Sequence, residues 1–458
     1  MMNKKPNCIL FVIDTLRADH LSCYGYFRNT SPNIDQLAKE GILFKDAHAT
    51  AIATGPGFTS IMTGLSPIHH HFYLTPWNLP NLIDFDDAIL TLPEIIQDSI
   101  GGYTTAAFDN LINFSSHMDQ FVRGFEFYVN ATCTSRPVHH HITGGQVNRR
   151  LVPWLREHKD ENFFAFVHYW DPHTPYNQPD KFRRIFHHEP GRLGDLEVLE
   201  APAGYRYVPG WGKVGELWEP RPEEGKPTID LYDGEIRYVD QMIGEVIGVL
   251  DELDIADKTV IIITSDHGEQ LGQHGLYDHR GLHESVIFIP LIIWAPGILP
   301  SGKTVEGCVQ QADIAPTILS LLGAEEKDLP RFDGVNLIPI IEGERKATSE
   351  MFIEDHDQRA VVQGRWKYIR NYFERTEELY DIRRDPVEVV NLAAKEKERV
   401  QTMRQHLFSW VNKNLGGQPD PMWLQMAKWA AEWAAAFKEE FPNLRPRPTI
   451  IHELDEKS

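Results

Sequence analysis

Four runs of consecutive apolar residues stand out along the chain, each followed by polar residues. They are Cys8–Ile13, Phe163–Val167, Thr259–Thr264 and Pro290–Trp294. Uninterrupted apolar runs of this length are typical of strands that are buried on both faces, as in the middle of a parallel sheet. Between them lie stretches with helical spacing of apolar residues, at Ser31–Glu40, Leu92–Asp98 and Gly234–Leu253. Strands that alternate with helices predict a doubly wound α/β sheet flanked by helices.

The remaining regions differ from this pattern. Residues 179–227 are rich in proline, glycine and charge, which predicts a long surface insertion that caps a cleft. Beyond residue 345 the chain changes to short alternating segments, which predict a small antiparallel sheet: Ala360–Val362, Trp366–Ile369 and Glu378–Tyr380. We therefore expect a large α/β domain at 1–345, a smaller α+β subdomain of sheet and helix at 346–416, and a helical extension at 417–458.

The extension carries large apolar side chains at helical spacing. They are Met422, Met426, Trp429, Trp433 and Phe437. Such a stripe packs on the domain or on a second copy of the chain, so a homo-oligomer formed through the C-terminal helix is possible. A helix that lies on a membrane surface would have basic residues on its other face, and few are present.

The composition of the chain restricts the classes of partner that the protein is expected to bind. A net charge of −21 argues against nucleic acid or an anionic membrane as a partner, and an anionic ligand must then be held by local positive charge or a metal. No stretch approaches the ~20 apolar residues of a membrane span, and the N-terminal apolar run is too short for a signal peptide. The four cysteines are scattered without a CxxC motif, which favours free thiols. We expect a cytoplasmic protein.

Polar residues gather where the predicted strands end. Asp14, His168 and Asp266 each lie at or just past the end of an apolar run. Because ligands bind beyond the carboxyl ends of the strands in α/β sheets, these side chains are expected at one edge. Each alone would be a weak signal, since a lone Asp more often caps a turn. Together with His267 they offer carboxylates and an imidazole, which are ligands for one divalent cation such as Mn²⁺, Mg²⁺, Ca²⁺ or Zn²⁺.

Thr54 lies in a Gly/Pro-rich turn before a predicted helix. The backbone N–H groups at a helix N-terminus favour an anion. A nearby cation would lower the pKa of the hydroxyl and neutralise charge on a transferred group. Thr54 is therefore a candidate nucleophile.

Several motifs resemble those of known enzymes. The segment Thr54–Gly64 resembles the active-site signature of type I sulfatases, Cys-x-Pro-Ser-Arg followed by a short helix that ends in Thr-Gly. Further segments are similar to sulfatase-like proteins: Val12–Gly25, Phe166–Tyr176, Thr264–Gly275 and Leu379–Leu392. The resemblance, to the sulfatase-like part of the alkaline phosphatase superfamily, covers nearly the whole chain. It implies an alkaline-phosphatase-like fold in which Asp14, Asp266, His267 and Thr54 bind the metal.

The chain departs from that family at positions that matter for chemistry. Thr54 stands where the family has the cysteine that is oxidised to formylglycine, and a threonine cannot become that aldehyde. A sulfo-threonine would have to be hydrolysed at sulfur, whereas water can attack a phospho-threonine at phosphorus. Phe58 replaces the signature arginine, and Thr15 replaces the second residue of the usual Asp-Asp pair, which leaves the fourth protein ligand open.

The residues near these departures have expected roles. His279, followed by Arg280, stands where the family has a lysine, and could be the general acid for the leaving oxygen. His173 is expected to contact the substrate in a catalytic role, and Asn110, His168 and Arg280 to bind substrate. Asp171, His173, His279 and His356 are suitable ligand types for a second ion, but their spacing makes one ion the expectation. The triplets at 69–71 and 139–141 point in different directions and are not expected to chelate one ion.

These observations predict a metal-dependent hydrolase of a small anionic ester, either a phosphodiester or a phosphonate monoester. The reaction would pass through a phospho-threonine at Thr54. One alternative is a sulfate ester hydrolase that works without formylglycine. The others are a phosphotransferase and a non-catalytic binding protein.

Overall fold

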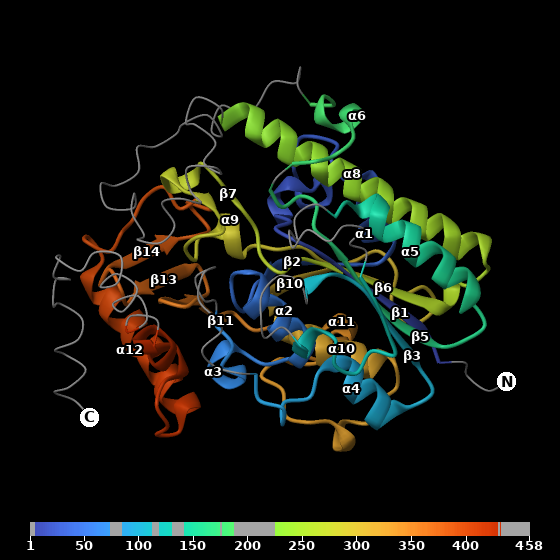
Figure 1. The fold of residues 1–458 in the computed structure, drawn as a ribbon. Helices are drawn as coiled ribbons and strands as arrows, with labels where there is room; N and C mark the ends of the chain where they lie inside the picture. The colour runs from blue at the N-terminus through green and yellow to red at the C-terminus, as the bar shows by residue number, and fades with distance from the viewer. Residues whose placement is uncertain are drawn as a thin grey trace.

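The computed structural model describes residues 5–73, 85–111, 119–130, 142–174, 176–186, 225–428 and 431. At its centre is an eight-stranded sheet in the order β10-β2-β9-β6-β1-β5-β3-β4 (Figure 1). The strands are β1 (Asn7–Ile13), β2 (Ile42–His48), β3 (Thr104–Phe108), β4 (Phe127–Val129), β5 (Phe163–Tyr169), β6 (Thr259–Thr264), β9 (Leu291–Trp294) and β10 (Lys303–Gln310). The four apolar runs of the sequence are all strands of this sheet.

Most neighbouring strands of the sheet are parallel, and β9 is the exception. It pairs antiparallel with both β6 and β2, whereas β1 pairs parallel with β5 and β6. All seven residues of β1 are buried, which explains their uninterrupted apolar character. The sheet is therefore mixed and parallel-rich, and the predicted fold class is confirmed.

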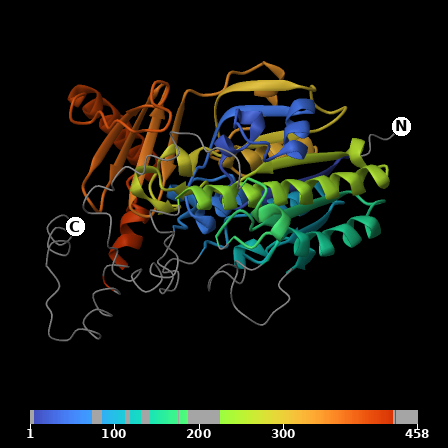
Figure 2. The ribbon, with the colours of Figure 1, turned by 90° about the horizontal axis from the view of Figure 1, so that it is seen from above.

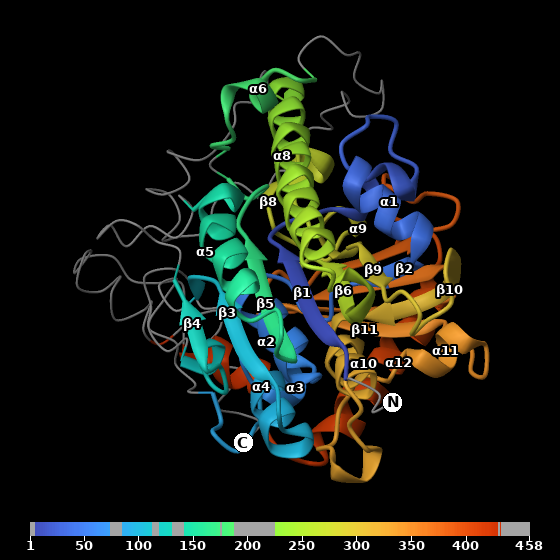
Figure 3. The ribbon, with the colours of Figure 1, turned by 90° about the vertical axis from the view of Figure 1, so that its right-hand side faces the viewer.

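Helices cover both faces of the sheet (Figures 1 and 3). One face carries α1 (Pro32–Glu40), α5 (Gly144–Glu157) and α8 (Gly225–Glu252), which Figure 2 shows from above. The other carries α2 (Thr54–Thr63), α4 (Leu92–Ile95) and α10 (Ile314–Leu321). The predicted helix at Leu92–Asp98 is α4 continued by a π-helical turn at Ile96–Ile100. The shorter helices are α3 (Pro67–His70), α6 (Asp180–Arg183), α9 (Glu284–Ile287) and α11 (Ile338–Glu342).

A second, antiparallel sheet lies beside the first. Its strands, in spatial order, are β11 (Glu350–Glu354), β12 (Gln358–Gln363), β13 (Trp366–Asn371) and β14 (Glu377–Asp381). The helix α12 (Lys397–Leu415) packs its Met403 and Leu407 against buried Tyr368 and Leu379 of this sheet. The sequence predicted three of the strands but not β11. A small ribbon of β7 (Gln270–Leu271) and β8 (Tyr277–Asp278) completes the strands.

Parts of the expected organisation fall outside the described residues: 187–224 of the predicted insertion, His139–His141, Cys133, and Trp429, Trp433 and Phe437 of the C-terminal stripe. Within the described part of that stripe, Met422 is buried and Met426 is half-buried, while the neighbouring Trp423 and Leu424 are exposed. Cys8, Cys23 and Cys308 are free thiols. In the described ranges, no helix has both the length and the apolar character needed to cross a bilayer.

Candidate active site

The polar residues predicted at the sheet edge do meet there. The four adjacent strands β6, β1, β5 and β3 run parallel, so their carboxyl ends lie side by side. Asp14 follows β1 directly, Asp109 follows β3, and His168 is the penultimate residue of β5. Asp266 lies two residues beyond β6.

Asp14, Asp266 and His267 form a buried group whose ligand atoms all lie within 4.8 Å of one another. Within the described residues, both oxygens of Asp14, Oδ2 of Asp266 and Nε2 of His267 have no hydrogen-bond partner. Unpaired buried polar atoms are costly, and two carboxylates side by side repel. Burial, followed by the charge of Asp266, raises the pKa of Asp14 to about 7. This donor set fits a divalent cation.

Backbone groups hold the three side chains in place. Asp266 Oδ1 accepts hydrogen bonds from the N–H of Thr15 (3.1 Å) and of His267 (2.8 Å), which turns Oδ2 toward Asp14 and His267. His267 Nδ1 lies 2.9 Å from the carbonyl of Gly268, so the ring donates there and leaves Nε2 as an acceptor. Thr15 is β-branched yet has φ +57°, a strained conformation directly after Asp14.

Thr54 is the first residue of α2 and is buried. Ala53, just before it, has φ 69° and ψ 150°, a combination that is rare outside glycine. One turn further along the helix, a Cβ added to Gly57 would lie 2.9 Å from the Asp266 carbonyl oxygen and 3.3 Å from its Cβ. The first turn of α2, which begins at Thr54, therefore packs directly against Asp266.

Gly57→Ala is expected to separate α2 from Asp266, because the added methyl group would meet backbone atoms that cannot rotate away. A displacement of this kind costs catalysis more than stability, since misplacement by about 1 Å can lower a rate ~100-fold. We expect turnover to fall ~100-fold with a loss of stability of about 1–3 kcal/mol. Steady-state kinetics and denaturant unfolding measure both. Gly248→Ala, at a helical glycine with open space around it, is the matched control.

His279 lies next to this group and is held by two carboxylates. Its Nδ1 is 2.6 Å from Asp278 Oδ1 and 4.0 Å from Glu269 Oε2. Its ring centroid is 4.5 Å from that of His267 and 5.6 Å from that of His173. Although burial opposes the charge, Asp278 and Glu269 raise the pKa of His279 well above its ordinary value. The two carboxylates thus favour a proton on His279, which is half-buried beside the candidate metal ligands.

His173 has the opposite character. Its Nδ1 bonds the carbonyl of Thr174, and its buried Nε2 has no partner among the described residues. Burial, followed by the charge of His279, lowers the pKa of His173 to about 3. It is therefore a neutral imidazole, able to accept or donate one hydrogen bond at Nε2 but not to act as a cation.

His168 lies within a line of buried polar groups. Its Nδ1 is 2.7 Å from Asp109 Oδ1, and its Nε2 is 3.5 Å from Asp14 Oδ2. Tyr128 donates a 2.7 Å hydrogen bond to the other oxygen of Asp109. Phe58, at the position of the signature arginine, packs its ring edge-on against His168, with centroids 4.6 Å apart. The structure thus directs His168 at Asp14.

The other two predicted substrate-binding residues lie near the same edge. Asn110 is buried and its Oδ1 accepts a hydrogen bond from the indole N–H of Trp170. Arg280 follows His279 and is half-buried, and its charge acts on both Asp278 and His356.

Sequence reasoning missed Asp109, Tyr128, Glu269 and Asp278, which set the orientation and charge of the histidines. Asp109 had a usable signal, because it follows a short apolar stretch just as Asp14 does. Glu269 and Asp278 had no recognisable sequence signal, because they are brought together by a β-ribbon whose strands are only two residues long.

The residues considered for a second ion do not assemble as one group. Asp171 Oδ2 accepts the N–H of Gly144 at 2.7 Å. Two other groups in the described chain have ligand-like spacing, namely Glu269 with Asp278 and His279, and Asp355 with His356 and Asp357. His69 and His70 point to different partners, Asp333 and Ser60, as expected for adjacent residues, and His70 is buried.

Comparison with known proteins agrees with this arrangement. The sequence profile of the family described as Sulfatase matches residues 6–324, and that of the N-sulphoglucosamine sulphohydrolase C-terminal region matches residues 272–413. A sulfatase of Formosa agariphila is 28% identical over 449 residues, covering 87% of this chain and 86% of the relative.

Two solved structures share the fold. One, in complex with its substrate D-glucosamine-2-N,6-O-disulfate, has a TM-score of 0.72 at 22% identity and covers 91% of this chain and 99% of its own. The other, the phosphonate monoester hydrolase of Agrobacterium radiobacter, has a TM-score of 0.71 at 21% identity and covers 90% of this chain and 96% of its own. Enzymes of this family are metal-dependent hydrolases of ester bonds. The chain belongs to the sulfatase family of the alkaline phosphatase-like superfamily.

Proposed function

We propose that the protein hydrolyses a phosphodiester or a phosphonate monoester, with Thr54 as the nucleophile. The observation that carries the proposal is the position of Thr54, a residue that cannot become formylglycine, on a helix turn packed against Asp266. The fold shared with a phosphonate monoester hydrolase supports it.

Hydrolysis of the ester would take place as two successive displacements at phosphorus. In the first, Thr54, which has already lost its hydroxyl proton to solvent, attacks through Oγ1 and forms a P–O bond while the bond to the leaving oxygen breaks. His279, held as a cation by Asp278, donates a proton from Nε2 to the departing oxygen. In the second, water attacks the phospho-threonine, its proton returns to His279, and the bond between phosphorus and Thr54 breaks.

Asp14, Asp266 and His267 would hold one divalent cation, either Mn²⁺, Mg²⁺, Ca²⁺ or Zn²⁺. When bound, that cation supplies Lewis-acid stabilisation of negative charge on the nucleophile and on the transferred group. The N–H groups of the first turn of α2 add positive potential at the same place.

The charge of the site favours a monoanionic reacting group. Asp278 and Glu269 raise the pKa of His279, while burial lowers the pKa of His173 and Phe58 stands where the family has an arginine. A phosphodiester or phosphonate monoester carries one negative charge at phosphorus, as a sulfate ester does at sulfur. Charge alone does not distinguish phosphorus esters from sulfate esters, so the proposal of a phosphorus ester rests on Thr54.

The second candidate function is a sulfate ester hydrolase that works without formylglycine. The overall similarity of the chain to a sulfatase of Formosa agariphila favours this function. Turnover of matched 4-nitrophenyl esters, namely a sulfate, a methyl phosphodiester and a phenylphosphonate, separates the two in the presence of each divalent ion. We expect the phosphorus esters to be preferred, and an adduct on Thr54 in the intact mass after rapid acid quench. A preference for the sulfate ester would reverse the ranking.

The localisation and the self-association of the protein are also part of this proposal. We infer a cytoplasmic protein from the free thiols Cys8, Cys23 and Cys308. We also infer self-association through the C-terminal segment, where Trp423 and Leu424 beside the stripe are exposed. Sedimentation of the purified chain at several concentrations tests the second point.

A further inference from the structure

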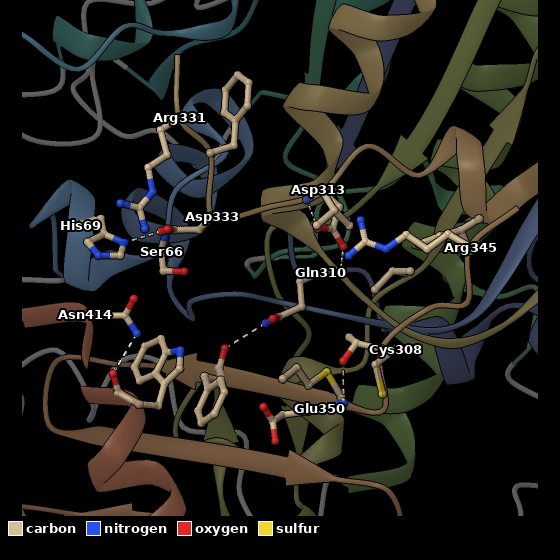
Figure 4. Close-up of a pocket in the computed structure, with 18 of the residues that line it drawn as sticks. Ser66, His69, Cys308, Gln310, Asp313, Arg331, Asp333, Arg345, Glu350 and Asn414 are labelled. Atoms are coloured by element: carbon tan, nitrogen blue, oxygen red, sulfur yellow. Dashed lines mark hydrogen bonds and ion pairs between the residues drawn. The ribbon is translucent and has the colours of Figure 1, made fainter. Parts of the chain in front are cut away.

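A cavity of about 340 Å³ lies where the two sheets meet, away from the candidate active site (Figure 4). Its walls come from the end of β10, the start of β11, the C-terminal end of α12 and the segment that follows α2. Ser66 lines it from that segment, so α2 separates the cavity from Thr54 by about 15 Å of helix. The cavity is large enough for a small organic ligand.

Three basic residues line this cavity, and all three are exposed: Arg331, Arg345 and Lys346. Across the described residues, none of them lies within 4.0 Å of a carboxylate oxygen in an ion pair. Figure 4 shows the Arg331 guanidinium directed toward Asp333 and His69, and that of Arg345 toward Asp313. A gathering of basic side chains without close ion pairs is notable in a chain whose net charge is −21.

The carboxylates of the cavity already have other partners. Asp333 Oδ2 accepts from the N–H of Ser66 at 2.8 Å and lies 2.7 Å from His69 Nδ1. Asp313 accepts the N–H groups of Gln310 at 2.8 Å and Val335 at 2.7 Å.

Glu350, the third carboxylate, bonds His406 of α12. These acids therefore fix the wall, while the basic groups retain hydrogen-bond capacity for a ligand.

The cavity also has an aromatic wall. Phe352 of β11 and Trp410 of α12 stack with ring centroids 4.5 Å apart and planes 9° apart. Both rings line the cavity, and Trp410 is half-buried. Aromatic faces favour a planar apolar group, and the basic groups favour an acidic one.

We propose that this cavity binds a small organic anion that joins a planar ring to a sulfonate, sulfate, phosphate or carboxylate group. The acidic group pairs with basic side chains of the cavity wall, and the ring lies against Trp410 and Phe352. This site is separate from the proposed ester-cleaving centre and does not depend on its chemistry.

The cavity shares two elements with that centre. Gly64, which ends α2, accepts hydrogen bonds at its carbonyl from the N–H of Asp333 (2.9 Å) and of Gly334 (3.1 Å). Gln310 lines the cavity, and its neighbour Gln311 donates to the carbonyl of Ser265 at 2.9 Å, just before the candidate metal ligands. The cavity thus adjoins the far end of the helix that begins at Thr54.

The probe for the test is 4-fluorobenzenesulfonate, an aromatic anion that cannot be hydrolysed as an ester, observed by ¹⁹F NMR during titration of the full chain. We expect saturable binding that weakens about tenfold or more in the double variant Arg331→Ala/Arg345→Ala. Trp410→Leu should weaken it several-fold. Arg384→Ala, whose side chain is 77% exposed, is the matched loss of one positive charge and should leave binding unchanged.

The comparison of probes separates the two parts of the site. Inorganic sulfate should bind more weakly than the aryl sulfonate, because it lacks the ring. No saturable binding by the wild type, or unchanged binding in the double variant, overturns the proposal. If the double variant does not fold, as judged by circular dichroism, Trp410→Leu and Lys346→Ala decide: unchanged binding in both also overturns it.

Discussion

Replacement of Thr54 by alanine is expected to lower turnover of the best ester substrate by ~10⁴-fold or more, because it removes the proposed nucleophile. Stability should change little, since the alanine keeps the backbone of the first turn of α2. Stopped assays over the full range of divalent ions measure the loss. Intact-mass analysis of quenched reactions should at the same time lose the covalent adduct.

Thr59→Ala is the matched control for this substitution. Thr59 lies on the same helix and is also buried, but its hydroxyl donates to the carbonyl of Gly55 at 2.7 Å. Its loss should cost about 1 kcal/mol of stability and leave turnover within severalfold of the wild type. A Thr54→Ala protein that kept near wild-type turnover on every ester would show that no covalent step occurs at this residue.

Asp14→Asn is expected to have opposite effects on stability with and without a divalent ion. In chelator, the wild type buries two adjacent carboxylates, so removing one charge should stabilise the protein by roughly 2–4 kcal/mol at pH 8. With the ion present, only the wild type gains the binding free energy, and the order should reverse. Denaturant unfolding in both buffers measures the two differences, and turnover of the variant should be lost.

The pH dependence in chelator follows from the raised pKa of Asp14, from 3.8 to about 7. Below pH 3.8 the Asp14 carboxyl is protonated in both the folded and the unfolded protein, so Asp14→Asn has no stability advantage over the wild type. Between pH 3.8 and about pH 7, the Asp14 carboxyl has lost its proton in the unfolded chain but keeps it in the folded protein. The wild type therefore loses stability as the pH rises through this range. The advantage of Asp14→Asn should therefore grow from about pH 4 and level off above about pH 7. An advantage that stayed constant over this range would contradict the buried charge as its cause.

The strand predictions succeeded where the sequence carried a strong local signal. The residues of β1 read as one apolar run because both faces of the strand are covered, and the same is true of β5 and β6. The direction of β9 had no such signal, since an apolar run is the same in parallel and antiparallel pairing. The edge strand β10 buries only Val305 and Val309 and contains a bulge between Val305 and Cys308, so its residues form no clear strand pattern in the sequence.

The candidate site divides in a similar way. Asp14, Thr54, Asp266 and His267 could be proposed as candidates from the sequence, because each lies beside a strong structural signal and all belong to motifs that resemble those of one family. The protonation of His279 could not, because it depends on Asp278 and Glu269 at once. Neither could the orientation of His168, which is set by Asp109 from a neighbouring strand.

The order of residues along the chain thus determined the layers, the strand ends and the candidate reactive side chains, because burial and backbone pairing act over short stretches. Three-dimensional packing decided which carboxylates face one another, which imidazoles carry charge and where Gly57 meets Asp266. Those properties depend on distances of a few ångströms between residues far apart in the chain. Electrostatic energy and steric contact change steeply over such distances, and a linear pattern does not encode them.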